Sequence, residues 1–501
     1  MNESGAAITQ TEMATVTFAP SGESIEVPVG TSVLDAAILC DLDLRAPCAG
    51  AGRCGRCRVL IVGGNVQRRS NAGLEVAEVA DGWAVACQTF VSGPANVEIP
   101  QRRKESVRPH GHAVAEPESL PLDCDWRQNP AVRTFDLRIE PPSLNDNTSD
   151  LDRVQREFTR QHDIEQIRAE LPLLRGLAAA LRAADWNVSV TLEMRDWVHG
   201  VCLPPRMIDV RAVDAHAGNF GLAVDVGTTS IVAYLVDFET GRVVDTSSAY
   251  NRQIACGEDV TSRIIYAKRA AGLERLRSLV VETTNELVAK LTERNHISPQ
   301  EIHEVVAAGN TTMTHLLLGL DPKYLREEPY IPTISSPPKL TAWDLNLDVN
   351  PQARVHCLPG VGSYVGGDIT AGVISSGLFA TEKLSLLIDI GTNGEMVLGN
   401  KDWLLACACS AGPAFEGGGV KHGMRATAGA IEDVFIDDSS LEPSFRTIDD
   451  APAVGVCGSG LIDLLGELFV TGLLDKAGRL NRDAATTRVR LRDGVPEYVL
   501  A

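Results

Sequence analysis

The hydrophobic and polar positions of residues 14–100 predict a small α+β domain. The turn sequence PSG at 20–22 separates two short stretches rich in β-branched residues, a pattern typical of a β-hairpin. Residues 31–43 have the spacing of a helix, and Ser32 and Asp35 are placed as a capping box at its start. Three further strands are expected at residues 57–64, 83–90 and 95–100.

The next stretches predict a linker and a second small α+β domain. Residues 101–125 are polar, contain proline and show no apolar period, so we expect a linker there. Within residues 126–213, the segments SDLDRVQREF and PLLRGLAAALRAAD have helical spacing, and NVSVTLEM alternates as a strand does. This domain shows no catalytic constellation in its sequence, and we interpret it as a spacer or docking module.

From residue 219 to 501 the pattern changes to apolar strands, glycine turns and long helices, which is typical of an α/β domain. One feature repeats within it. The segment LAVDVGTTS at 222–230 recurs as LLIDIGTNGE at 386–395, with Asp225 and Asp389 in equivalent places. A strand–turn element that is duplicated at domain-scale spacing predicts two related subdomains facing one cleft.

Composition and charge narrow the class of protein. The 501 residues are 44% hydrophobic and 22% charged, as in an ordinary globular protein. The formal net charge of −20 disfavours non-specific binding to nucleic acid or to an anionic membrane. The N-terminal residues have neither the basic start nor the apolar core of a signal peptide, and no apolar run reaches membrane-spanning length. We therefore expect a cytoplasmic protein that binds neither nucleic acid nor membrane.

Four of the twelve cysteines form a constellation with the spacing Cys48-x5-Cys54-x2-Cys57-x29-Cys87. In a reducing compartment such a cluster favours metal ligation over disulfides. Three ligands in one short loop and a fourth from a distant strand suit a cluster of two iron atoms, because each iron needs two thiolates. Structural zinc is the alternative, but a zinc ribbon usually has two Cys-x2-Cys pairs and there is only one here.

The loop CAGAGRCGRC also has the small and basic residues that such a cluster demands. Its three glycines let backbone N–H groups turn toward sulfur, and its two arginines offset the cluster's negative charge. The N-terminal domain therefore resembles the 2Fe–2S ferredoxin family with its β-grasp fold, although the first gap is one residue longer than the plant-type spacing. The resemblance implies that Cys48 and Cys54 bind one iron. Cys57 and Cys87 would then bind the other.

The duplicated Asp–x–Gly–Thr turns predict a second chemistry. A strand that ends in this sequence and is followed by another strand offers backbone N–H groups and hydroxyls to phosphate oxygens. The aspartate at its edge can hold Mg²⁺ directly or through water. One such turn is equally typical of a tight hairpin. Two of them predict a nucleotide whose triphosphate is gripped by one loop from each subdomain.

This layout resembles the ATPase superfamily of actin, sugar kinases and heat-shock chaperones (ASKHA), with its ribonuclease H-like fold. The resemblance implies two phosphate loops that bind ATP and Mg²⁺. Their candidate binding residues are Asp225, Gly227, Thr228, Thr229 and Ser230 in the first loop and Asp389, Gly391, Thr392, Asn393 and Gly394 in the second. Asp225 and Asp389 would serve the metal. Asp368, within GGDITAG, is the candidate for orienting the attacking water, and a simple helix N-cap is its alternative role.

The whole chain resembles the reductive activators of corrinoid enzymes, which are ATP-dependent iron–sulfur proteins. The resemblance rests on the cysteine loop, both phosphate loops and, among others, the segments NRQIACGEDVTSRI, AAGNTTMTHLLLG, GGDITAG, SAGPAFEGG and CGSGLID. It implies that the cluster returns an inactive Co(II) corrinoid to Co(I). The partners would be a corrinoid protein or its methyltransferase and a low-potential electron donor, and a homodimer is one option for the assembly.

Two other functions stay open at this point. One is ATP-dependent electron donation to another low-potential enzyme, such as a radical dehydratase, although such activators usually hold their cluster across a dimer interface. The other is a 2Fe–2S module that binds a corrinoid protein and passes electrons without ATP. The sequence up to Ala501 favours it, because the Gly–Gly adenosine loop and second connecting helix of the superfamily are missing. We therefore expect an incomplete second subdomain, from a truncated product or a site completed by another chain.

Overall fold

The structure is a computed structural model, and it divides into two compact units, one ending at Thr381 and one running from Glu382 to Ala501. Every helix among the described residues is too short or too polar to span a bilayer. The described residues are 12–40, 42, 44, 46, 50, 52, 55, 57–71, 74–100, 130–198, 200–213, 218–391, 393–409, 420–424, 426–484, 486–492 and 494–501.

The N-terminal part of the first unit is a five-stranded sheet with a helix packed on it. Its elements are β1 (Met13–Ala19), β2 (Ser24–Pro28), α1 (Val33–Leu39), β3 (Arg58–Arg68), α2 (Val76–Ala80), β4 (Trp83–Val85), the 3₁₀ turn η1 (Ala86–Gln88) and β5 (Thr89–Glu98). The strand order is β2-β1-β5-β3-β4, with β1 and β5 parallel at the centre. Because α1 buries Val33, Leu34 and Ile38 in the core, this is the predicted β-grasp arrangement.

The local predictions for this sheet hold, apart from one strand. β1 and β2 form the expected antiparallel hairpin, and Ser32 caps α1 by accepting a hydrogen bond from the Asp35 N–H at 3.1 Å. The single strand predicted over 83–90 is wrong, because η1 breaks it and β5 continues from Thr89 through the region predicted as a separate strand. The turn takes Cys87 out of the ladder, so that its sulfur can meet Cys57.

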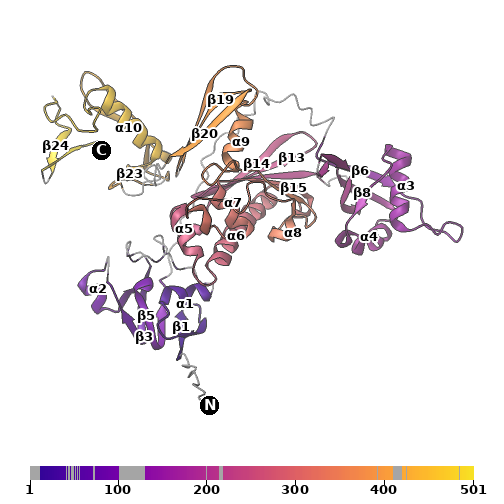
Figure 1. Cartoon of the computed structure of the whole chain (residues 1–501), viewed down its shortest axis with the longest axis horizontal. Helices are drawn as coiled ribbons and strands as arrows, with labels where there is room; N and C mark the ends of the chain where they lie inside the picture. Colours follow the sequence, from indigo (N-terminus) through magenta and orange to yellow (C-terminus); the bar gives the residue numbers. More distant parts are fainter. Residues whose placement is uncertain are drawn as a thin grey trace, which may run out of the picture. The chain divides into compact units, whose positions relative to one another are not determined.

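A second sheet follows, covered by two helices. Its elements are β6 (Val132–Arg138), α3 (Asp150–His162), β7 (Arg168–Ala169), α4 (Leu171–Ala183), β8 (Asn187–Glu193), β9 (Asp196–Val198), β10 (Val201–Leu203) and β11 (Arg206–Ala212). The strand order is β6-β8-β11-β7, and α3 and α4 pack against this sheet (Figure 1). Phe135, Phe158 and Leu181 lie in its core. Both predicted helices and the predicted strand β8 are therefore confirmed.

The remainder of the first unit is a six-stranded α/β layer. Its elements are β12 (Phe220–Val226), β13 (Ser230–Asp237), β14 (Arg242–Tyr250), η2 (Arg252–Ala255), α5 (Val260–Ala267), α6 (Gly272–Asn295), η3 (Pro299–Glu301), β15 (Ile302–Ala308), α7 (Thr311–Leu318), η4 (Lys323–Leu325), β16 (Leu340–Thr341), α8 (Ala342–Leu345), β17 (Arg354–Cys357) and α9 (Gly367–Ser375).

The topology of this layer decides where a ligand can bind. The strand order is β14-β13-β12-β15-β17-β16, and β12, β15 and β17 are parallel neighbours. α6 buries Leu276, Leu279 and Leu287, at helical spacing, and packs beside α7 and against the sheet (Figure 1). Because the parallel strands end at one edge, the loops that follow β12, β15 and β17 gather there, where ligands of open α/β sheets bind.

The second unit contains the repeated hairpin. Its elements are β18 (Ser385–Ile390), β19 (Gly394–Asn400), β20 (Trp403–Cys409), β21 (Ala430–Ile436), β22 (Pro443–Thr447), η6 (Ile448–Asp450), β23 (Gly455–Val456), α10 (Gly458–Val470), β24 (Val489–Arg492) and β25 (Val495–Tyr498). β18 and β19 pair antiparallel around residues 391–393, as β12 and β13 do around the first turn. The duplicated strand–turn–strand element read from the sequence is therefore present in both units.

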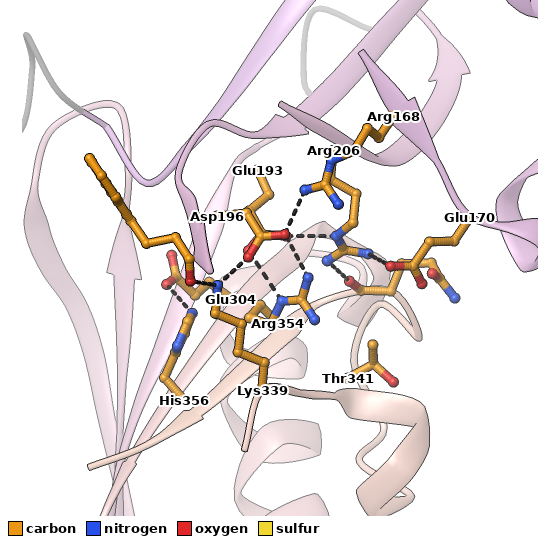
Figure 2. Close-up of polar contacts among 12 residues, drawn as sticks. Arg168, Glu170, Glu193, Asp196, Arg206, Glu304, Lys339, Thr341, Arg354 and His356 are labelled. Atoms are coloured by element: carbon orange, nitrogen blue, oxygen red, sulfur yellow. Dashed lines mark hydrogen bonds and ion pairs between the residues drawn. The ribbon is translucent and has the colours of Figure 1, made fainter. Parts of the chain in front are cut away.

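Buried charges join the sheet of β8 and β11 to the six-stranded layer (Figure 2). The Glu193 carboxylate, at the end of β8, accepts a hydrogen bond from Arg206 Nε at 2.6 Å. It also accepts two from Arg354 on β17, at 3.1 and 3.0 Å. Burial alone would raise the pKa of Glu193, but the two guanidinium groups outweigh it and lower that pKa. The carboxylate is thus ionised and fully engaged.

A second acidic group lies beside the first. Asp196 binds Arg168 at 2.5 Å and also contacts Lys339, which comes from the six-stranded layer (Figure 2). Burial opposes ionisation here too, yet the hydrogen bonds from Lys339 and Arg168 lower the pKa of Asp196 to about 2. Glu193 and Asp196 belong to the first of these sheets and its hairpin, whereas Arg354 and Lys339 come from the six-stranded layer. These ion pairs therefore join the two sheets.

Replacing Arg354 tests how much this joint contributes. Arg354→Met leaves Glu193 buried with one guanidinium instead of two, and we expect a loss of about 3 kcal/mol in the free energy of unfolding. Urea unfolding followed by circular dichroism measures it. The matched control is Arg252→Met, which removes an exposed ion pair with Glu286 and should cost less than about 1 kcal/mol. Equal losses in the two variants would contradict a buried charge joint.

Candidate iron–sulfur and phosphate sites

The described part of the cysteine loop brings Cys57 and Cys87 together. Cys57 immediately precedes β3, Cys87 lies in η1, and both side chains are buried. The Ala86 N–H donates to the Cys57 carbonyl at 2.8 Å, which fixes η1 against the end of the loop. Cys48 and Cys54, the other two predicted ligands, lie outside the described residues.

The surroundings of Cys87 favour its thiolate. A hydrogen bond with the Cys57 side chain is the largest cause, and the Gln88 side-chain amide, 3.8 Å from the sulfur, adds to it. The Gly52 N–H also donates to this sulfur, and Arg269 contributes a positive charge. Together these groups outweigh burial and lower the pKa of Cys87 to about 6. Because the thiolate is the form that binds metal, this pair fits an iron–sulfur ligand set.

Two glycines shape the loop around these sulfurs. Gly50 and Gly52 have φ of +80° and +74°, in the left-handed region that favours glycine. A Cβ on Gly52 would lie 2.6 Å from Nε2 of Gln88, so a side chain there would displace that hydrogen-bond donor. The expectation that glycines turn N–H groups toward sulfur is borne out at Gly52.

The first phosphate loop lies between β12 and β13 and is held from behind by Asn251. The Asn251 N–H donates to the carbonyl of Thr229 at 2.9 Å, and its side-chain amide donates to the carbonyl of Gly227 at 2.9 Å. Asn251 is completely buried, so both hydrogen bonds are shielded from water. Because Asn251 binds these two carbonyls from the interior, the N–H groups of the loop can be directed away from Asn251, toward a ligand.

Two further side chains, the buried Arg263 and the partly exposed Asn310, complete this support. Arg263 of α5 donates from Nη2 to the Thr228 carbonyl, and Asn310 donates to the Thr228 hydroxyl at 2.9 Å. The Thr229 hydroxyl is buried and has no hydrogen-bond partner among the described residues. A hydroxyl in that state fits a loop whose ligand is phosphate or hydrated Mg²⁺.

Two helix N-termini lie at the same edge of the sheet. Asn310 caps α7 by accepting from the Met313 N–H at 2.9 Å, and the Gly367 N–H at the start of α9 donates to the Gly309 carbonyl at 2.9 Å. A Cβ on Gly366 would lie 2.5 Å from the Cα of Asn310, so this approach requires glycine. N-termini of helices favour anions, so their position beside the loop suits phosphate.

Among the acidic candidates, Asp368 is not the helix N-cap that was its alternative interpretation. It is the second residue of α9, whose N-cap is Gly366, so the interpretation of Asp368 as the N-cap is wrong. Its carboxylate is half-buried and accepts from the Ile369 N–H at 2.9 Å. Asp225 is exposed on β12, next to the loop, where a metal could reach it. The catalytic and metal roles of both residues stay predictions.

The second loop, in the other unit, has a related form. Asp389 pairs with Glu395 across β18 and β19 and is exposed, while the Gly391 N–H donates to the Asn393 carbonyl at 2.8 Å. Gly394 opens β19, and Thr392 lies outside the described residues. The loop has the tight turn that its sequence predicts, and its phosphate contacts stay a prediction.

Sequence reasoning missed the three side chains that hold the first loop. Asn251 and Arg263 lie within NRQIACGEDVTSRI, and Asn310 lies within AAGNTTMTHLLLG. Both segments contributed to the family resemblance, but neither was assigned a chemical role. No signal in the sequence marks these three residues, because their partners in the first loop lie 24 to 82 residues away along the chain.

Comparison with family models covers most of the chain in four consecutive matches. They are a 2Fe-2S iron–sulfur cluster binding domain at 16–92, the RACo linker region at 122–216, the RACo middle region at 220–381 and the C-terminal, ASKHA domain of RACo at 383–501. The first match supports a 2Fe–2S cluster over the zinc alternative.

Individual relatives agree with these matches. The corrinoid activation enzyme RamQ of Eubacterium limosum is 32% identical over 458 residues, which are 91% of this chain and 70% of RamQ. The [Co(II) methylated amine-specific corrinoid protein] reductase of Methanosarcina barkeri is 24% identical over 294 residues, 52% of this chain and 53% of that protein. The solved structure of a reductive activator for corrinoid, iron–sulfur protein aligns with a TM-score of 0.65 and 40% identity, over 97% of this chain and 77% of that one.

Cys57→Ser tests the cluster site. We expect a wild-type chain with about two irons after anaerobic reconstitution and a variant with at least a several-fold loss of iron and visible absorbance, because each iron needs two thiolates. The exposed Cys202→Ser is the control and should keep its iron. Unfolding of residues 382–501 should be unchanged. Full iron content in Cys57→Ser, or loss of structure throughout the chain, would contradict the assignment.

Asn310 offers a test of the first phosphate loop. Asn310→Ala removes both the cap of α7 and the hydrogen bond to Thr228, at a cost of about 2 kcal/mol in unfolding free energy. Asn310→Ser keeps a capping hydroxyl and should cost about half as much. Calorimetric titration with Mg-ATP should show weaker binding in both variants, since both release Thr228. Unchanged binding in both would show that Asn310 does not support a nucleotide loop.

Proposed function

This chain belongs to the RACo family of reductive activators of corrinoid proteins, and from that premise we propose that it transfers single electrons to a corrinoid protein. The transfer returns cobalt from Co(II) to Co(I) and is coupled to ATP binding and hydrolysis. One observation carries the proposal: a thiolate-favouring cysteine pair and an internally braced phosphate loop occur in the same compact unit.

The electron-transfer part of this function depends on how the chain holds its iron–sulfur cluster. When bound, a 2Fe–2S cluster supplies one electron at a time, which a low-potential donor must replace. Cys57 and Cys87 hold one side, and we assign Cys48 and Cys54 to the other. The Gly52 N–H and the Gln88 amide are directed at the Cys87 sulfur and stabilise its negative charge.

The nucleotide half uses the edge of the six-stranded layer. The N–H groups of Gly227, Thr228 and Thr229 and the side chain of Ser230 are proposed to bind phosphate oxygens. Asp225, exposed beside them, is proposed to hold Mg²⁺ directly or through water. Asp368 is proposed to orient the attacking water, because α9 and the first loop are both braced by the Gly309–Asn310 turn. In the second loop we propose the same phosphate and metal contacts for Asp389, Gly391, Thr392, Asn393 and Gly394.

ATP is needed because the electron transfer is unfavourable on its own. Each ~59 mV of uphill transfer of one electron corresponds to a tenfold change in the equilibrium constant, or about 1.4 kcal/mol. A nucleotide-dependent state that binds the Co(I) partner better than the Co(II) partner would offset such a deficit. The chain requires reduced thiolates for its cluster, and we therefore place it in the cytoplasm.

Anaerobic reduction of a Co(II) corrinoid protein tests this function. With excess reductant and Mg-ATP, the reconstituted chain should form Co(I), followed by its absorbance, much faster than without nucleotide. Asp225→Asn should slow the reaction about 10–100-fold, as loss of a metal contact does. Asp237→Asn, at the opposite end of the same hairpin, is the control and should retain the rate. Equal rates with and without nucleotide would contradict ATP coupling and favour a simple electron-passing module.

A further inference from the structure

Arg269 connects the nucleotide-binding layer to the iron–sulfur domain. It follows α5, and its Nη1 lies 2.5 Å from Oδ1 of Asp35 in α1. The Asp35 carboxylate is itself held by the hydroxyl of Ser32, which donates to it at 2.5 Å. Both members of the ion pair are partly shielded, with 20% and 32% of their side chains exposed. This pair is therefore less screened than a typical surface ion pair.

The same guanidinium enters the cysteine loop. A Cβ on Gly50 would lie 1.7 Å from Nη2 of Arg269, so the arginine occupies space that exists because residue 50 has no side chain. Arg269 is thus a positive charge from one domain placed beside the cysteine loop of another.

A second contact involves the segment that precedes Arg269. The Ala46 N–H, just before the cysteine loop, donates to the carbonyl of Ala255, the last residue of η2. η2 begins directly after Asn251, whose amide holds the carbonyl of Gly227 in the phosphate loop. The phosphate loop and the region of the cysteine loop therefore both contact the same short stretch of chain, residues 251–269.

The interior of this stretch is rigidly built. Arg263 on α5 is fully buried and donates to the carbonyls of Gly257 and Thr228, at 3.0 Å for the former. Its Nη1 also donates to the Gln253 side-chain oxygen at 3.0 Å. A displacement of Thr228 would thus be passed to η2 and α5 together, because buried hydrogen bonds are costly to break singly.

We propose that residues 251–269 couple the phosphate loop to the cluster, with Arg269 as the residue that docks the iron–sulfur domain and raises its reduction potential. This inference rests on the proposed function, since it needs both a cluster and a nucleotide. A nearby positive charge stabilises the reduced cluster, which carries one more negative charge than the oxidised one. Nucleotide in the first loop then changes the potential by moving Arg269 relative to the cysteine loop.

Hydrogen–deuterium exchange of the cluster-free full chain tests the docking. Arg269→Gln should increase exchange several-fold in α1 and η2, because the ion pair to Asp35 and the contact of Ala46 are lost. Lys268→Gln is the matched control: it removes the same charge one residue earlier, from an exposed pair with Glu327, and should leave both segments unchanged. Identical exchange in the two variants would overturn the docking.

Electron paramagnetic resonance titration of the reconstituted chain tests the tuning. Arg269→Gln should lower the midpoint potential of the cluster by up to ~59 mV, which corresponds to a tenfold change in the equilibrium constant for one electron. The variant should also lose the shift in midpoint potential that Mg-ATP causes in the wild-type chain. Asp35→Asn should weaken the docking of the iron–sulfur domain, as Arg269→Gln does. Combining the two substitutions should add little to the effect of either one. If Co(II) reduction requires ATP but Arg269→Gln and Lys268→Gln have equal potentials, this inference fails and the proposed function stands. If the potentials differ but reduction ignores ATP, the tuning stands and the proposed function fails.

Discussion

The first phosphate loop keeps its shape because buried polar side chains hold its carbonyls from the inside. Asn251 and Arg263 bind three consecutive carbonyls, and Asn310 binds the hydroxyl of Thr228. Asn251 and Arg263 are buried, so their donors would be expensive to leave unpaired in the core. The strands, α5 and α7 that supply the donors are thereby committed to one arrangement around a prospective anion site.

Arginine recurs at three places in the first unit where separate segments meet. Arg263 braces the phosphate loop, Arg354 joins two sheets through Glu193, and Arg269 reaches the cysteine loop. A guanidinium suits these positions because it is always charged and presents several donors in a plane, so one side chain can satisfy groups from two elements. In a chain with a net charge of −20, these cations are placed where carboxylates, thiolates and phosphates must be brought together.

Local sequence patterns predicted much of this architecture. The hairpin of β1 and β2, the cap at Ser32, the helices α3 and α4 and the repeated strand–turn–strand element all depend on residues close in sequence, and all are present. The strand expected through Cys87 was wrong because η1 forms where Cys87 meets a partner, Cys57, thirty residues away. The supporting roles of Asn251, Arg263 and Asn310 were not predicted for the same reason. Their role exists only once the sheet brings distant segments together, and a single sequence carries no record of that proximity.

We propose that one chain stores an electron and uses nucleotide to release it to cobalt. A single-turnover experiment tests this most directly. The reconstituted chain is reduced, separated from reductant and mixed with a Co(II) corrinoid protein, and the oxidation of the cluster and the formation of Co(I) are followed together. We predict one Co(I) for each cluster oxidised, in the presence of Mg-ATP and far more slowly without it. Cluster oxidation that is equally fast and complete without nucleotide, or that yields no Co(I), would contradict the account.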